Sequence, residues 1–248
     1  MKTGLTSYFI FVSLQPEEVM NKRNNALSIQ LLWQSGAPAN YIYAAMHSLL
    51  GTVAKLGLEE RITIEPVGSL PTLNVDVLLN EARKEGSRIH LMPGQADIRT
   101  VGRSLESYVM AKGKRAPRLF LIAADDYSIQ EPEEEYVFGY TTYPESCTVS
   151  TYRHATDQRI TDRLGLFSLM VIHEFGHLIN AADAERGEAL KNWLGMHCTN
   201  ACVMRQRDDL PDFERDVLPH MNAGHLFCDL CTRDIRRFMD TRYPLASP

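Results

Sequence analysis

The chain has 248 residues, of which 44% are hydrophobic and 23% are charged, enough for one sizeable core with a small appendage. The net charge of -5 and the lack of a block rich in lysine and arginine argue against a nucleic-acid partner, because binding to phosphates depends on clustered cations. The apolar stretch at 8–14 is too short to span a bilayer and no cleavage site follows it, so neither a membrane partner nor a signal peptide is expected.

Apolar runs alternate with amphipathic segments over the first half of the chain. The apolar runs predict strands at 28–33, 61–67, 88–92 and 118–124. Apolar residues spaced three and four apart predict helices between them, at 40–57, 73–86 and 100–113, each closed by a glycine. A strand-helix-strand rhythm of this kind predicts a largely parallel, twisted sheet with covered faces.

The rhythm stops at Asp125. Residues 125–135 are polar and acidic, and we interpret them as a solvated surface loop, with a cation-binding loop as the alternative. Residues 136–144 and 146–154 then alternate and carry aromatic and β-branched side chains, which predicts an antiparallel hairpin at the sheet edge. An edge strand can pair with an extended peptide. His154 and Tyr143 are candidates to line a cleft there, although a neutral surface role suits both.

A helix over 161–178 carries the sequence HEFGH at 173–177. Residues four apart lie on one helix face with β-carbons about 5 to 6 Å apart, so His173 and His177 can bind one ion, for which zinc is the natural choice. Glu174 is displaced by about 100° and is placed to contact a water on the open side of the metal, which makes it the candidate general base. The alternative is that the two histidines and the glutamate share a helix face without a metal, as an ordinary surface or as a buried hydrogen-bonded cluster.

Four of the five cysteines lie at short spacings in the last fifth of the chain, namely Cys198, Cys202, Cys228 and Cys231. This pattern is typical of a metal site in a reducing compartment, hence a cytoplasmic protein, with four free thiols as the alternative. His220 and His225 could replace one of these cysteines as ligands, whereas Cys147 suits a half-buried apolar position on the hairpin.

The segments HEFGH, GMHC at 195–198, CVM at 202–204 and CDLC at 228–231 together resemble the archaemetzincins, a family of zinc metallopeptidases in the metzincin clan. The family motif runs HExxHxxGxxHC, then a second cysteine, a valine-methionine pair and a late CxxC. The resemblance implies two Zn²⁺ ions, with Glu174 as the base and Met204 beneath the catalytic metal. It implies a catalytic zinc held by His173, His177 and His197, and a structural zinc held by Cys198, Cys202, Cys228 and Cys231.

The sequence departs from the family motif around the third histidine. Asn180 stands where the family has glycine, fourteen extra residues at 181–194 precede Gly195, and the first cysteine pair is one residue closer than usual. No departure removes a ligand type. Asparagine tolerates a left-handed helix end, and Gly195 can supply a sharp turn before His197.

Asp183 is the rival third ligand, because it lies ten residues after His173, where the motif places its last ligand. If the helix continued through residues 181–190, Asp183 would lie about 15 Å along the axis and out of reach. A glycine turn before His197 and a cysteine after it favour His197, with Glu185 and Glu188 as weaker alternatives.

These features predict an α/β chain of the α+β metzincin-like kind, with a mostly parallel sheet, an antiparallel edge strand, an active-site helix carrying HExxH and a small zinc-stapled C-terminal subdomain. We expect an upper catalytic lobe at 28–180, a helical insertion at 181–194 and a zinc-binding lobe at 195–240. The expected function is zinc-dependent hydrolysis of peptide bonds in a peptide or protein substrate. The alternatives are an inactive protein-binding module stabilised by the four-cysteine zinc, and hydrolysis of a non-peptide amide. The sequence leaves the oligomeric state open.

Overall fold

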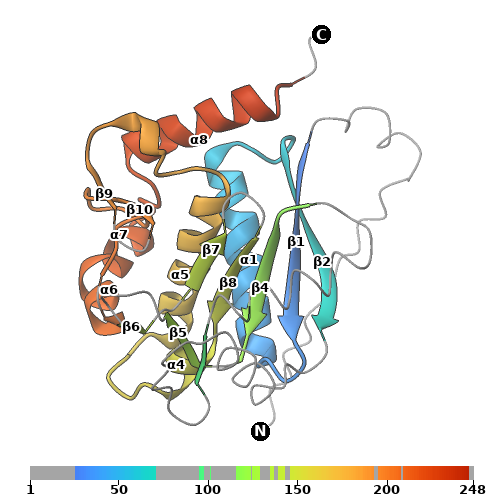
Figure 1. The fold of residues 1–248 in the computed structure, drawn as a ribbon, viewed down its shortest axis with the longest axis vertical. Helices are drawn as coiled ribbons and strands as arrows, with labels where there is room; N and C mark the ends of the chain where they lie inside the picture. The colour runs from blue at the N-terminus through green and yellow to red at the C-terminus, as the bar shows by residue number, and fades with distance from the viewer. Residues whose placement is uncertain are drawn as a thin grey trace, which may run out of the picture.

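The structure is a computed structural model that describes residues 26–70, 95–97, 101, 116–123, 125–128, 135–136, 139–142, 146–192, 195–207 and 209–245. Within this part of the chain, the main sheet has five strands in the order β2-β1-β4-β8-β7 (Figure 1). Four strands run parallel, and β7 pairs antiparallel with β8 at one edge, as predicted. Their bounds are β1 Leu27–Gln34, β2 Ile62–Leu70, β4 Arg118–Ile122, β7 Gly139–Thr142 and β8 Ser146–Ser150.

Two long helices, α1 (Ala39–Leu56) and α5 (Arg163–Leu178), lie side by side against one face of this sheet (Figure 1). α1 ends at Gly57, whose φ of 67° is left-handed, so the predicted glycine stop is confirmed. The ring of Tyr41 on α1 meets that of Phe167 on α5 edge-on, with centroids 4.8 Å apart. Every residue of β4 and β8 is buried, so α5 rests on a close-packed core.

The chain beyond α5 forms the C-terminal lobe. α8 (Asp229–Arg242) lies across one end of the two long helices (Figure 1), and its Asp240 accepts a 2.7 Å hydrogen bond from Arg61 beside β2. Glu214 accepts the backbone N–H of Thr161 at 2.9 Å, which ties this lobe to the start of α5. The elements are η1 Ala184–Arg186, β9 Leu190–Asn192, β10 Met196–Cys198, α6 Leu210–Asp216, α7 Leu218–Asn222 and α8 Asp229–Arg242.

The two described parts of the polar segment, residues 125–128 and residue 135, form strands and not loops. β5 (Asp125–Ser128) pairs with β3 (Gln95–Asp97) and with β6 (Glu135–Tyr136) in a second sheet of order β3-β5-β6. The loop prediction is wrong there because backbone pairing with two neighbours outweighs the poor strand propensity of aspartate. The predicted strand at 146–154 is also too long, since β8 ends at Ser150 and α4 (Tyr152–Thr156) follows.

The expectation of a helical segment at 181–194 is wrong as well. α5 ends at Leu178, and Asn180 has a φ of 58°, a left-handed conformation that stops the helix. A 3-10 turn and the strand β9 follow. The boundaries of the three expected units remain a prediction.

Several predicted elements lie outside the described residues. They are the stretch at 8–14, the helix at 73–86, the strand at 88–92 and, apart from the helical Val101, the helix at 100–113. Among the helices that the structure does describe, none has the length and apolar character needed to cross a bilayer.

Candidate metal centres

Two histidines of the candidate site come from α5. Asp162 caps this helix by accepting the N–H of Gly165 at 2.8 Å, and the helix then runs without interruption through HEFGH. His173 is buried and His177 is half-buried on one face, as the i, i+4 spacing predicted. Their Nε2 atoms are 3.2 Å apart.

The third histidine is His197, which β10 brings to the other two. Its Nε2 lies 3.2 Å from Nε2 of His177. Gly195 has a φ of 123°, so the sharp turn expected before His197 is present. Asp183 instead caps η1 and pairs with Arg237 at 2.6 Å. The structure therefore gathers His197, and not Asp183, with the α5 histidines.

The outer ring nitrogens of this group are held by backbone oxygens. Nδ1 of His173 lies 2.8 Å from the carbonyl oxygen of Val203, and Nδ1 of His197 lies 3.1 Å from that of Gly195. A carbonyl oxygen can only accept a hydrogen bond, so both rings carry hydrogen on Nδ1 and direct the Nε2 lone pair inward. Converging lone pairs repel each other unless a cation lies between them.

The two distances of 3.2 Å from Nε2 of His177 also fit zinc. Bonds of 2.0–2.1 Å in a tetrahedral arrangement place neighbouring nitrogens about 3.3 Å apart. Burial lowers the pKa of His173 to about 4 and holds that of His177 well below its usual value. Both rings therefore stay neutral near pH 7, which is the state that binds a metal.

Glu174 lies between this group and the edge strand β7. Its side chain is buried, and Oε2 accepts a 2.5 Å hydrogen bond from the hydroxyl of Thr141. The backbone of β7 passes so close that a Cβ added to Gly139 would lie 2.5 Å from Oε1 of Glu174. Burial raises the pKa of Glu174 to about 8, although the Thr141 hydrogen bond opposes this shift. Sequence reasoning found Glu174 but missed Thr141, whose only signal was its place in the predicted hairpin.

A cleft of about 650 Å³ opens onto the histidines. Glu174 and Thr141 lie on one side, and Arg237 of α8 lines another part. His154, a candidate for this cleft, is instead fully buried and contacts the carbonyl oxygen of Ser150, while Tyr143 lies outside the described residues.

The second group contains the four late cysteines, which are all free thiols with their Sγ atoms within 4.8 Å of one another. Sγ of Cys198 lies 3.7 Å from that of Cys228, and Sγ of Cys202 lies 3.9 Å from that of Cys231. Tetrahedral zinc-sulfur bonds of 2.3 Å require a spacing of about 3.8 Å. Cys228 occupies the N-cap position of α8 and Cys231 lies in its first turn, so CxxC stands at a helix start. Hydrogen bonding to Cys202 lowers the pKa of Cys198 to about 6.

The remaining candidates are elsewhere. His220 and His225 are exposed and lie outside the cysteine group, and Cys147 is buried on β8. Met204 is fully buried, and its Sδ atom occupies the space beside Gly176 that a Cβ would need.

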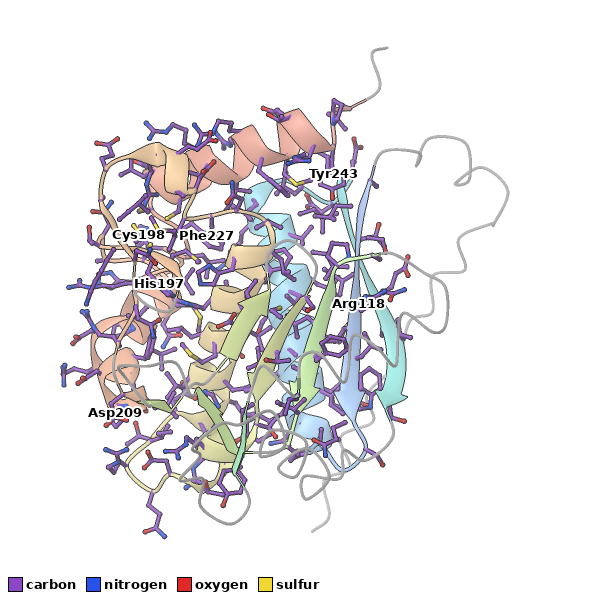
Figure 2. The ribbon with its side chains drawn as sticks, in the orientation of Figure 1. Arg118, His197, Cys198, Asp209, Phe227 and Tyr243 are labelled. Carbon is purple, nitrogen blue, oxygen red and sulfur yellow. The ribbon has the colours of Figure 1, made fainter. Side chains whose placement is uncertain are left out.

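The strand β10 joins the two groups. Successive side chains of a strand point to opposite faces, so His197 reaches the histidines while Cys198 reaches the cysteines. Figure 2 shows these two residues next to each other in the C-terminal lobe.

No family model and no curated protein matches this sequence, but solved structures match its fold. The archaemetzincin from Methanopyrus kandleri aligns with a TM-score of 0.55 at 18% identity, covering 88% of this chain and 98% of that one. A zinc-dependent peptidase from Methanocorpusculum labreanum aligns at 0.47, with 20% identity over 84% and 99% of the two chains. Metalloproteinase-II from Bacteroides fragilis aligns at 0.41, with 13% identity over 77% and 48%. The first likeness shows that this chain has the archaemetzincin fold, as the resemblance of its motifs implied.

Proposed function

We propose that the chain is a zinc-dependent peptidase whose catalytic metal is held by His173, His177 and His197. The observation that carries this proposal is the convergence of three imidazole rings, with Nε2 atoms 3.2 Å from that of His177, on a cleft that also contains the buried side chain of Glu174. Three protein ligands leave a coordination position for water or substrate, which is the arrangement of catalytic zinc sites. The archaemetzincin fold supports the same reading.

A zinc ion held by His173, His177 and His197 would supply the Lewis acidity that polarises a carbonyl oxygen and makes water nucleophilic near neutral pH. The charge of that ion would oppose the burial that raises the pKa of Glu174, so Glu174 in its ionised form would take a proton from the attacking water and pass it to the leaving amine. The Thr141 hydroxyl fixes Oε2 of Glu174, which leaves Oε1 for the proton transfer. The carbonyl oxygens of Val203 and Gly195 hold two of the rings in orientation, as carbonyl partners of metal-bound histidines do.

An extended peptide suits this cleft. β7 pairs with β8 on one side only within the described sheet, and its Gly139 and Thr141 line the cleft next to Glu174. A substrate strand pairing with the other side of β7 would carry its backbone past the base. The substrate is therefore a peptide or an exposed segment of a protein.

We propose a second, structural zinc at Cys198, Cys202, Cys228 and Cys231. Four thiolate donors close the coordination shell, so this ion stabilises the C-terminal lobe and takes no part in hydrolysis. Four free, closely spaced thiols also suit a reducing compartment, which is why we propose a cytoplasmic protein.

The decisive experiment incubates the purified chain with a mixed peptide library and identifies products by mass spectrometry, with and without a chelator. We expect chelator-sensitive cleavage that falls by at least about a hundredfold in Glu174→Gln, while zinc content stays unchanged. Glu59→Gln, an identical change at an exposed turn, is the matched control.

Two results would overturn the proposal. Cleavage that survives Glu174→Gln would remove the assigned base. A fully zinc-loaded chain that cleaves no peptide would favour the inactive binding module, or a zinc hydrolase acting on a non-peptide amide.

A further inference from the structure

The segment between the two histidine-bearing elements contains a fully buried arginine. The side chain of Arg186, at the end of η1, has 0% exposure, and that of its partner Asp234 on α8 has 1%. A buried ion pair often stabilises a fold no better than apolar residues of the same volume, because both charges lose their water. The position of this pair therefore calls for a reason besides folding stability.

The contacts of Arg186 supply that reason, since the guanidinium lies against the cysteine group. Nη1 donates to Sγ of Cys231 at 3.4 Å and to Oδ2 of Asp234 at 3.1 Å. Nη2 donates to the carbonyl oxygen of Ala189 at 3.0 Å, and Nε donates to that of Glu188 at 3.0 Å. The guanidinium is thus held by one carboxylate and two backbone oxygens, and it presents one N–H to sulfur.

The negative charge of a zinc-loaded cysteine group explains why a cation beside it is favourable. Four thiolates around Zn²⁺ leave a net charge of about -2 in a buried place. A guanidinium that donates to a ligand sulfur offsets part of this charge and fixes the direction of the sulfur lone pair. Asp234 would only add to the negative charge, so its role is to hold Arg186.

The same segment is also bonded to the ligand strand. β9 pairs antiparallel with β10, so that Leu190 lies opposite Cys198 and Lys191 opposite His197. The carbonyl oxygen of Ala189, which accepts from Arg186, also accepts the N–H of Thr199 at 2.9 Å. Arg186 therefore connects Cys231 on α8 to the strand that carries Cys198.

We propose that Arg186 is a positioning residue of the four-cysteine metal centre, where it offsets thiolate charge, and that residues 184–192 form the brace that holds it there. This inference rests on the structural zinc of the proposed function, but it does not depend on peptidase activity.

The test uses Arg186→Met in the full-length chain, with Arg233→Met as the matched control. Arg233 lies on α8 and faces the same segment, but it pairs with Glu188 at the surface at 3.4 Å, with both side chains more than half exposed. The chain is loaded with cadmium, because the thiolate-to-cadmium charge-transfer band reports the cysteines and not the histidines. Chelator competition followed on this band should show about a 10- to 100-fold loss of affinity in Arg186→Met and none in Arg233→Met.

A second variant covers the case in which Arg186→Met fails to fold because Asp234 loses its buried cationic partner. Arg186→Met with Asp234→Asn removes both charges, which a merely structural pair tolerates. If the proposal is right, the double variant folds but still loses cadmium affinity, and Arg186→Lys recovers part of it.

Unchanged affinity in a folded Arg186 variant would overturn the proposal, as would failure of both variants to fold with metal supplied, since the pair would then be purely structural. A wild-type chain without the cadmium band would overturn it too. In that last case, chelator-sensitive peptidase activity would show that the histidine centre is unaffected.

Discussion

The two groups of ligands differ in how they meet the solvent. The histidines open onto the cleft, and His177 is only half-buried. Of the cysteines, Cys198, Cys202 and Cys231 are buried, and only Cys228 is partly accessible. A three-donor site beside a cleft can exchange its fourth ligand, whereas a four-donor buried site cannot. We therefore propose that the histidine group serves reaction and the cysteine group serves stability.

The supporting structure differs in the same way. Two of the three histidines lie on α5, which the sheet and α1 hold, whereas the cysteines join β10 and the loop after it to the start of α8. Removing the ligands of the first centre should therefore cost activity, and removing those of the second should cost folding free energy.

The largest effect is expected for Cys228→Ser with Cys231→Ser. Structural zinc sites contribute on the order of 10 kcal/mol of binding free energy, so the double variant should lose one zinc equivalent and several kcal/mol of stability. Elemental analysis and thermal unfolding measure both. Cys147→Ser, which changes a buried cysteine outside the group, should keep both ions. Retention of all the zinc in the double variant would contradict a cysteine centre.

The next largest effect concerns the third histidine. His197→Ala should weaken zinc at the cleft by at least about a hundredfold, since even loss of a supporting contact to a ligand costs 10- to 100-fold. Asp183→Ala should leave that affinity unchanged, because Asp183 pairs with Arg237. Competition with a chromogenic chelator distinguishes them, and the reverse result would place Asp183 at the metal.

Gly176→Ala tests the contact between α5 and the C-terminal lobe. The added methyl group would meet Sδ of Met204 and lie 3.1 Å from Cε1 of Phe227, so we expect a loss of about 1–3 kcal/mol from overpacking. Gly51→Ala, in a part of α1 where a Cβ meets nothing within 4 Å, should be neutral or stabilising. Equal unfolding free energies for the two variants would show that the contact beside Gly176 can accommodate a methyl group.

The smallest effect is expected for a change at Thr141, which contacts the proposed base Glu174. Thr141→Val removes the hydroxyl that donates to Glu174, and the loss of about 1.5 kcal/mol corresponds to roughly tenfold in kcat/KM. Zinc content should not change. Thr63→Val, at the opposite edge of the sheet, is the control, and equal kinetics in both variants would remove Thr141 from the mechanism.

The sequence predicted what depends on local periodicity. The spacing of apolar residues placed α1 and α5, Gly57 placed the end of the first helix, and the i, i+4 rule paired His173 with His177. The resemblance of residues 195–198, 202–204 and 228–231 to the family motif, together with the turn at Gly195, predicted that His197 belongs to the site.

What the sequence could not show depends on contacts between distant segments. Residues 181–194 contain good helix formers, but the left-handed Asn180 stops α5 and pairing with β10 selects a strand. The burial of Arg186 depends on contacts among three elements, so the local sequence around this charged residue does not predict it. The contact of Thr141 with Glu174 likewise requires the register of β7 against β8.

The neighbouring positions of His197 and Cys198 limit how this chain can change in length. Adding or deleting one residue between Gly195 and Cys198 would reverse the alternation and turn each donor toward the wrong group. An insertion between these positions would therefore damage both groups together. A change in length within residues 184–192 would likewise shift the pairing of β9 with β10, which places Leu190 opposite Cys198 and Lys191 opposite His197.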